Sequence, residues 1–279
     1  MDGAAIFKER LNEQEIKEVN DFVREMAATQ GLIYKLDVDT LTVDAEEQSS
    51  HILGYEDGAL SGYAAINGNH KNEDEVTFIC RGEQSFHIMH EKLMCSAPGR
   101  SERILAIANR CDVALIEWLK CMGYSFLNTE LRMAFNISGF KPLIRSGLVI
   151  RNAYECDRDI VLVIDKESFK MGGSFEISQQ DLKRTRVAIM NDEIVGKLRT
   201  YANTGIYGIY GFAIKTGYRG QGFGKAFLSS VLNEIIANGY EKIYLEVSSE
   251  NKPAAGLYQS LGFREEAVFD YYFKDKVIS

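Results

Sequence analysis

One short glycine-rich segment constrains this chain more than any other part of it. The sequence RGQGFGK follows a strand-like run at 207–214 and opens a segment whose apolar residues recur with the 3.6-residue period of a helix. Such a strand–loop–helix unit directs several backbone N–H groups at one point, where the helix dipole favours negative charge. We therefore predict a pyrophosphate-binding loop formed by Arg219, Gly220, Gln221, Gly222, Phe223, Gly224 and Lys225.

The spacing of these glycines narrows the class of ligand. It fits neither the G-x-G-x-x-G pattern of dinucleotide-binding folds nor the GxxxxGK[ST] pattern of nucleotide triphosphatases, so NAD and ATP are disfavoured. For the loop taken alone, a surface turn without a ligand remains the alternative.

Strand-like and helical runs alternate through both halves of the chain, which predicts an α/β protein (α+β, with a mixed sheet). A length of 279 residues suits two domains. The segment SGFKPLIRSG, residues 138–147, combines Gly, Pro and Ser and is the best linker candidate. We predict a first domain over 1–140, a linker over 141–147 and a second domain over 148–279.

The distribution of charge bears on partners. The net charge is −8, and the whole acidic excess lies in residues 1–147, which hold 15 Lys and Arg against 23 Asp and Glu. This balance disfavours nucleic acid and anionic membranes and favours cationic small molecules or basic peptides. No apolar run reaches the roughly 18 residues of a membrane helix, and the N-terminus lacks the layout of a secretory signal. We expect a cytoplasmic monomer or weak homodimer.

The cysteines and histidines give no metal or disulfide pattern. Five cysteines form an odd set without a CxxC pair, as expected in a reducing compartment. His87 and His90 are spaced i, i+3, with Glu91 and Cys95 nearby, which could place ligands on one helix face. The alternative is an ordinary polar face, and because no second group of ligands is evident we predict no metal site.

A second motif, LEVSSENKPAAGLYQSLGF, follows at residues 245–263. Together, R-x-x-G-x-G and N-x-x-A-x-x-L-Y-x-x-x-G-F resemble the two signature motifs of the GCN5-related N-acetyltransferase (GNAT) superfamily, in the family's order. The matching residues are Arg219, Gly222 and Gly224, then Asn251, Ala254, Leu257, Tyr258, Gly262 and Phe263. The resemblance implies acetyl-CoA as the acyl donor. It also implies that Phe212, Ala213 and Ile214 bind the pantetheine arm through their main chain, and that Asn251 and Tyr258 belong to the donor site.

Two side chains are candidates for catalysis. Tyr258 is protonated at neutral pH and could donate a proton to the departing thiolate, the part that the tyrosine of this motif plays in related enzymes. Glu246 could take the ammonium proton through a water, since the Leu-Glu-Val run resembles that of the family's protein N-terminal acetyltransferases, where the glutamate is the base. The resemblance places the oxyanion-binding N–H near Ala213. The alternatives are that Tyr258 only packs and that Glu246 lies on the solvated face of its strand.

These features predict an N-acetyltransferase that transfers acetyl from acetyl-CoA, by direct attack, to a small cationic amine or a peptide N-terminus. We expect the loop 171–176 to cover the acceptor, with Glu176 and Asp270 as candidate contacts to a cationic substrate. The alternative is that both carboxylates are solvated surface charges. Two alternatives remain: a non-catalytic acetyl-CoA-binding sensor, and an acyltransferase that uses a longer acyl-CoA.

The first half aligns with the second at a nearly constant offset. Residues 60–62 fall on 194–196, Arg81-Gly82 falls on Arg219-Gly220, and 122–124 fall on 261–263. Under this alignment Gly222, Gly224, Asn251 and Tyr258 are replaced by Gln84, Phe86, Asp112 and Leu119. We predict two tandem GNAT-like acyl-CoA N-acyltransferase domains, the first without the donor-site motifs. An unrelated α/β domain is the alternative.

Overall fold

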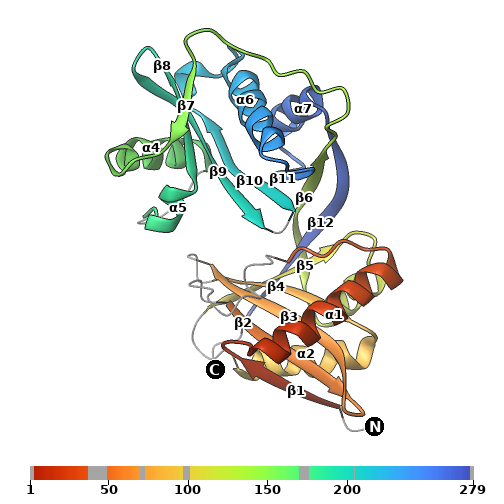
Figure 1. Cartoon of the computed structure of the whole chain (residues 1–279). Helices are drawn as coiled ribbons and strands as arrows, with labels where there is room; N and C mark the ends of the chain where they lie inside the picture. Colours follow the sequence, from red (N-terminus) through yellow and green to blue (C-terminus); the bar gives the residue numbers. More distant parts are fainter. Residues whose placement is uncertain are drawn as a thin grey trace. The chain divides into compact units, whose positions relative to one another are not determined.

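The computed structural model describes residues 3–36, 49–69, 73–96, 101–169, 176–203 and 205–276. The chain forms two compact units: a first unit of Met1–Glu130 and Ala267–Ser279, and a second unit of Leu131–Glu266 (Figure 1). This division differs from the predicted one. The predicted linker 141–147 lies inside the second unit, and the last residues of the chain belong to the first.

The first unit contains a mixed sheet. Its strands are β1 (Gly3–Lys8), β2 (Ser49–Glu56), β3 (Ala59–Asn69), β4 (Glu73–Cys80), β5 (Arg103–Asn109) and parts of β6 (Ser125–Phe135) and β12 (Phe263–Asp275). Its helices are α1 (Glu13–Gln30), α2 (Glu83–Ser96) and α3 (Val113–Cys121). Strands β1 to β4 pair antiparallel in sequence order, β4 and β5 pair parallel, and β12 pairs antiparallel with β5.

Local sequence explains where α1 begins and ends. Asn12 and Glu15 form a capping box, in which each side chain bonds the backbone of the other residue at 2.9 Å. Gly31 ends the helix in the left-handed region, with φ of +66°. One face of α1 then packs on β2, β3 and β4, through a buried cluster that includes Val19, Phe22, Met26, Leu53, Tyr63 and Ile79.

The second unit repeats this arrangement. Its strands are β7 (Val149–Asn152), β8 (Thr185–Met190), β9 (Glu193–Asn203), β10 (Ile206–Ile214), β11 (Lys242–Ser248) and the remaining parts of β6 and β12. Its helices are α4 (Arg158–Phe169), α5 (Gln179–Lys183), α6 (Phe223–Ala237) and α7 (Lys252–Leu261), with single 3₁₀ turns at Glu155–Asp157 and Thr216–Tyr218. Strands β7 to β10 pair antiparallel and β10 and β11 pair parallel, so the predicted α/β class with a mixed sheet is confirmed.

The helices of the second unit cover both faces of its sheet. Helices α6 and α7 lie on one face, and α4 and α5 lie on the other (Figure 1). The larger core lies under α6 and α7 and includes Leu198, Ile209, Phe227, Leu245 and Tyr258. A smaller cluster under α4 and α5 contains Val161, Ile177, Leu182 and Val187.

The order of elements recurs along the chain. The series β1, α1, β2, β3, β4, α2, β5, α3, β6 is repeated by β7, α4, β8, β9, β10, α6, β11, α7, β12, with α5 as an addition. The last strand of each series leaves its own repeat, because β12 lies beside β5 and β6 lies beside β11 in the strand order. The carboxyl end of β6 accordingly places Met133 and Phe135 in the core of the second unit.

Candidate functional site

The glycine-rich loop has the backbone geometry that was expected of it. Gly222 is the N-cap residue of α6 with φ of +82°, and Gly220 has φ of +72°, both in the left-handed region that favours glycine. No side chain of the described residues caps α6 at Gly222, so the first amides of this helix remain available to a ligand. The loop therefore suits an anion, and the binding of a pyrophosphate there remains a prediction.

Arg219 and Gly224 hold this loop in place. The Arg219 guanidinium donates hydrogen bonds to the carbonyl of Ile214, at 2.7 Å, and to the hydroxyl of Ser168 on α4, at 2.9 Å. A Cβ at Gly224 would lie 3.4 Å from the side chains of both Phe212 and Leu257, so glycine lets α6 pack closely on β10 and α7. Arg219 thus ties the loop to the end of β10 and to α4.

Strands β10 and β11 stop pairing beside this loop. Their parallel register ends at Ile209 and Leu245, although β10 continues to Ile214 and β11 to Ser248. A bulge follows in β10, with Gly211 at φ of +53°. In the described part of the chain, residues 212–214 pair only with β9, through Ala213 and Ile214. Their edge toward β11 is therefore available to a ligand's polar groups, as the pantetheine prediction requires.

Tyr258 lies next to these residues. Its side chain is 6% exposed, and its ring centroid is 6.1 Å from that of Phe212 and 6.0 Å from that of Phe263. Burial raises the pKa of the phenol well above its ordinary value, so the hydroxyl keeps its proton at neutral pH. Within the described parts of the chain this hydroxyl bonds no other residue, which leaves it available as a proton donor.

Glu246 lies on the opposite face of β11. Ile243, Leu245 and Val247 point into the core under α6 and α7, so the alternation of the strand turns Glu246 toward the other face, where it is half-buried. It directly follows Leu245, the last residue paired with β10. Tyr258, on α7, therefore lies on one face of the sheet and the Glu246 side chain on the other, near the point where β10 and β11 stop pairing. Their catalytic roles remain predictions.

Asn251 has a structural role that its motif did not reveal. It is the N-cap of α7, and its side-chain oxygen accepts a hydrogen bond from the Ala254 amide at 3.2 Å. Pro253 occupies the first turn, where a missing N–H costs nothing. A contact between Asn251 and the donor remains a prediction.

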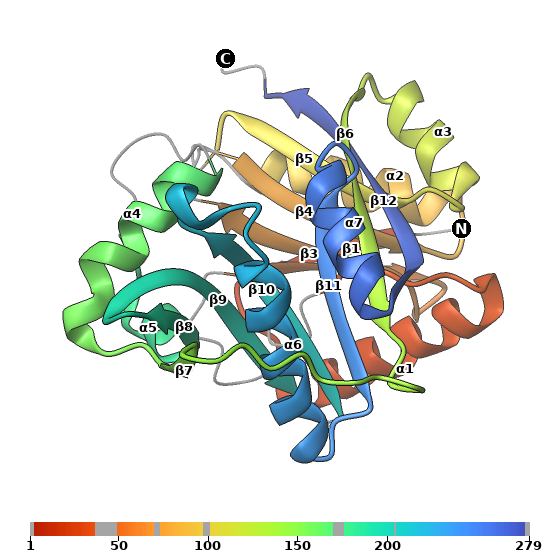
Figure 2. The same ribbon diagram turned by 90° about the horizontal axis from the view of Figure 1, so that it is seen from above.

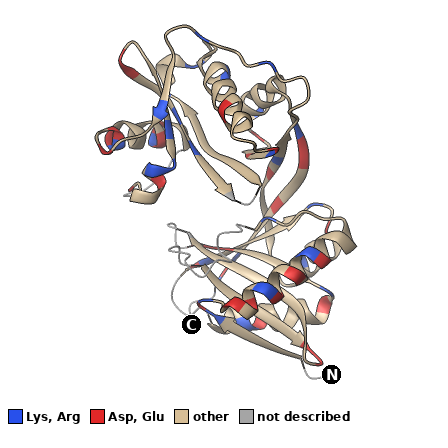
Figure 3. Ribbon diagram, viewed as in Figure 1, with Lys and Arg blue, Asp and Glu red and all other residues tan. Residues whose placement is uncertain are grey.

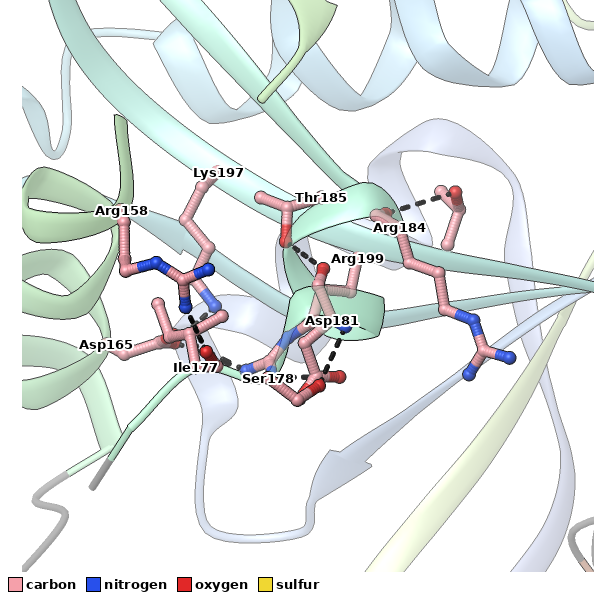
Figure 4. Close-up of polar contacts among 10 residues, drawn as sticks. Arg158, Asp165, Ile177, Ser178, Asp181, Arg184, Thr185, Lys197 and Arg199 are labelled. Carbon is pink, nitrogen blue, oxygen red and sulfur yellow. Dashed lines mark hydrogen bonds and ion pairs between the residues drawn. The ribbon is translucent and has the colours of Figure 1, made fainter. Parts of the chain in front are cut away.

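A buried charged cluster under the β10 bulge was not predicted. Asp165 on α4 forms an ion pair with Lys197 on β9 and lies 3.4 Å from Arg199 (Figure 4). A Cβ at Gly211 would lie 3.0 Å from the Lys197 amine and 3.1 Å from Arg199, so the two cations fill the space under the bulge. Burial lowers the pKa of Lys197 to about 8. Lys and Arg at alternate positions of a strand usually indicate a solvated face, so this pattern gave no reason to predict that the two side chains belong to a buried cluster.

The residues expected at the acceptor are only partly described. Residues 171–175 of the predicted loop lie outside the described residues, and Glu176 is exposed. Asp270 belongs to the first unit, where it bonds Arg110 and Thr129.

The first unit keeps contacts like those of the second, but it lacks glycine at the positions that the alignment gives to Gly222 and Gly224. Arg81, the counterpart of Arg219, forms a bidentate ion pair with Glu25 of α1, at 2.8 Å. Asp112 caps α3 as Asn251 caps α7. The residues at the positions of Gly224 and Tyr258, Phe86 and Leu119, are fully buried. Packed side chains thus occupy the positions of the donor motif.

Ion pairs use part of the first half's acidity. Acidic and basic side chains alternate along α1 (Figure 3), where Glu15 pairs with Lys8 and Asp21 with Arg24.

All five cysteines are free thiols. His90 is buried against Tyr124, whereas His87 is exposed, and the described residues hold no cluster of three metal-ligating side chains. None of the described helices is long and apolar enough to cross a membrane.

Comparisons with known proteins agree with this geometry. Residues 154–263 match the model of the acetyltransferase (GNAT) family. Ribosomal protein bS18-alanine N-acetyltransferase of Escherichia coli K12 is 32% identical over 82 residues, which cover 28% of this chain and 55% of that protein. An N-alpha-acetyltransferase of Sulfurisphaera tokodaii is 28% identical over 144 residues, 45% of this chain and 86% of that protein. The chain thus spans about half the length of the bS18 acetyltransferase.

Solved structures extend the likeness of fold to the whole chain. A tandem GNAT protein from the clavulanic acid biosynthesis pathway has a TM-score of 0.75 at 10% identity, with 100% of both chains covered. A GCN5-related N-acetyltransferase from Sphaerobacter thermophilus has a TM-score of 0.73 at 15% identity, covering 97% of this chain and 95% of the other. The predicted tandem fold is confirmed, with the family motifs in the second half alone.

Proposed function

Because this chain belongs, through residues 154–263, to the acetyltransferase (GNAT) family, we propose that it transfers the acetyl group of acetyl-CoA to a primary amine. The observation that carries this proposal is the position of Tyr258, a buried and protonated phenol beside the unpaired edge of β10. The open amides of α6 suit the diphosphate of the donor, and residues 212–214 suit its pantetheine arm.

The reaction balances with the side chains at this site. The neutral amine attacks the thioester carbonyl, a C–N bond forms and the C–S bond breaks. Glu246 accepts, through a water, the proton that the ammonium loses before the attack, and Tyr258 gives a proton to the departing thiolate. The second proton, which the acylated nitrogen releases, passes back to the Tyr258 phenolate and restores the hydroxyl. A main-chain N–H near Ala213 stabilises the oxyanion. The acetyl group passes directly from sulfur to nitrogen without an enzyme-bound intermediate.

For the acceptor we favour the α-amine of a peptide N-terminus. The relatives just described are named as alanine and N-alpha acetyltransferases. Both proposed catalytic residues, Glu246 and Tyr258, lie twelve positions apart inside the segment that matches the family model. A small cationic amine is the second candidate, because the chain carries a net charge of −8.

A thiol-release assay with mass spectrometry of the acceptor tests the proposal. The acceptors are a lysine-free peptide with a free N-terminal alanine, an N-terminally blocked peptide with one lysine, and spermidine. We expect turnover with the free α-amine and little with the other two. Turnover of spermidine alone would select the small-amine acceptor.

Two further outcomes would replace the proposed activity. Binding of acetyl-CoA without turnover of any amine would indicate a sensor of the donor. Faster turnover with a longer acyl-CoA than with acetyl-CoA would change the identity of the transferred group.

A further inference from the structure

Arg145 contacts the glycine-rich loop although it lies 76 residues before Gln221 in the chain. Its Nη1 donates a hydrogen bond to the Gln221 carbonyl oxygen at 2.6 Å, and its guanidinium carbon lies 3.7 Å from the centroid of the Phe223 ring. The same nitrogen is 3.5 Å from the position that a Cβ at Gly222 would take. Arg145 therefore contacts Gln221 and Phe223 and lies beside Gly222 between them.

The segment that carries Arg145 is attached to α6. The Leu143 amide donates to the hydroxyl of Ser229, a fully buried residue of α6, at 2.7 Å. The Leu148 amide donates to the Arg145 carbonyl at 3.2 Å. Figure 2 shows the chain between β6 and β7 crossing α6. These bonds fix the backbone on both sides of Arg145, so its contact with the loop belongs to the fold.

The hydrogen bond to Gln221 has a consequence for the next amide. The C=O and N–H of a planar trans peptide point in opposite directions, and the Gln221–Gly222 peptide is trans. Because Arg145 holds the Gln221 carbonyl toward itself, the Gly222 N–H of the same peptide points away from Arg145. One side-chain contact thus sets the orientation of an amide at the start of α6.

The charge of Arg145 is not neutralised locally. Its guanidinium makes no ion pair with a carboxylate in the part of the chain that the structure describes, and one of its five N–H groups bonds Gln221. Arg219, the other guanidinium of the loop, is bonded to Ile214 and Ser168. Arg145 therefore adds positive potential at a loop whose amides are open to an anion.

We propose that Arg145 is a positioning residue for the acyl donor: it aims the Gly222 N–H at the donor's diphosphate and raises the positive potential there. This inference rests on the proposed function, because the diphosphate is that of acetyl-CoA. It places a residue of the predicted linker in the donor site.

Calorimetric titration of the full chain with three ligands tests this role. Acetyl-CoA and acetyl-dephospho-CoA both carry the diphosphate, whereas acetyl-pantetheine carries no phosphate. The variants are Arg145→Gln, Arg145→Lys and the control Lys141→Gln, which removes an exposed charge from the same segment. We expect Arg145→Gln to raise Kd for both diphosphate ligands about tenfold, the loss expected when a hydrogen bond to a charged group is removed. Arg145→Lys restores part of the affinity, and Lys141→Gln changes it less than twofold.

Acetyl-pantetheine separates positioning from general damage to the fold. Its Kd should be the same in the wild type and in Arg145→Gln. An equal loss for acetyl-pantetheine, or no loss for acetyl-CoA, would overturn the inference. A loss for acetyl-CoA but not for acetyl-dephospho-CoA would also overturn it, because Arg145 would then serve the 3′-phosphate. If the wild type binds none of the three ligands, the proposed function itself fails before any variant is compared.

Discussion

Arg110 binds both carboxylate oxygens of Asp270, at 2.6 and 2.9 Å, although the two residues are 160 positions apart. Thr129 donates to the same carboxylate at 2.6 Å, and Asp270 is 5% exposed. Burial raises the pKa of Asp270. The hydrogen bonds from Arg110 and Thr129 and the charge of Arg110 lower it by more than burial raises it, so the pKa lies below its ordinary value. Asp270 is thus a structural residue of the first unit.

Asp270→Ala should lower the free energy of unfolding by about 2 kcal/mol at pH 7, since it removes charge-assisted hydrogen bonds from a buried carboxylate. Because the folded pKa is lowered, this stabilisation is present above the ordinary aspartate pKa and fades as the pH falls through the folded value. Urea unfolding at several pH values measures it. Asp275, also on β12, forms an exposed pair with Arg103 of β5, and Asp275→Ala should cost clearly less than Asp270→Ala because solvent screens that pair. Equal costs for the two variants would contradict this assignment.

Lys197 should give stability an unusual dependence on pH. Its folded pKa is lowered to about 8 by burial, whereas the unfolded chain keeps the ordinary value near 10.4. Between these values the unfolded state binds more protons, so the folded state gains stability as the pH rises. The wild type should therefore gain on the order of 2 kcal/mol over Lys197→Met between pH 7 and pH 10.

Urea unfolding of both proteins at the two pH values measures this gain. Lys166, an exposed lysine on α4 next to Asp165, provides the control. The free energy of unfolding of Lys166→Met should change with pH as that of the wild type does. A constant difference between wild type and Lys197→Met would show that Lys197 keeps its charge throughout.

Tyr258→Phe should lower kcat by about 10²-fold and leave the donor Kd within twofold. The substitution keeps the ring that packs on Phe212 and Phe263 and removes only the proton donor. Steady-state kinetics and donor titration check the two halves of this prediction. Unchanged kcat would exclude Tyr258 as the general acid.

Gly222→Val should abolish donor binding at concentrations that saturate the wild type. A β-branched residue resists φ of +82°, so the loop must change its backbone to accept it. The control is Gly217→Val, because Gly217 has no positive φ and a Cβ there meets nothing within 4 Å. Donor binding retained by Gly222→Val would place the phosphate site elsewhere.

The sequence by itself determined the features that act over a few residues. The side chains of Asn12 and Asn251 each cap a helix by accepting a hydrogen bond from an amide about three positions on. The positive φ of the loop glycines requires only that these residues lack a side chain. The 3.6-residue period behind α6 is local in the same sense. Tyr258 follows Asn251 by two turns of α7, so the helix itself fixes the position of Tyr258 relative to the N-cap.

Only the tertiary structure decided the long-range pairings. Nothing local to β12 reveals that it joins β5, since Tyr271 and Ile107 become partners through the closure of a long loop. The same holds for the burial of Lys197 against Asp165, the face of Glu246 and the contact of Arg145 with Gln221. A strand's alternation specifies two faces but not which one is buried, because that choice depends on the helices that pack against it.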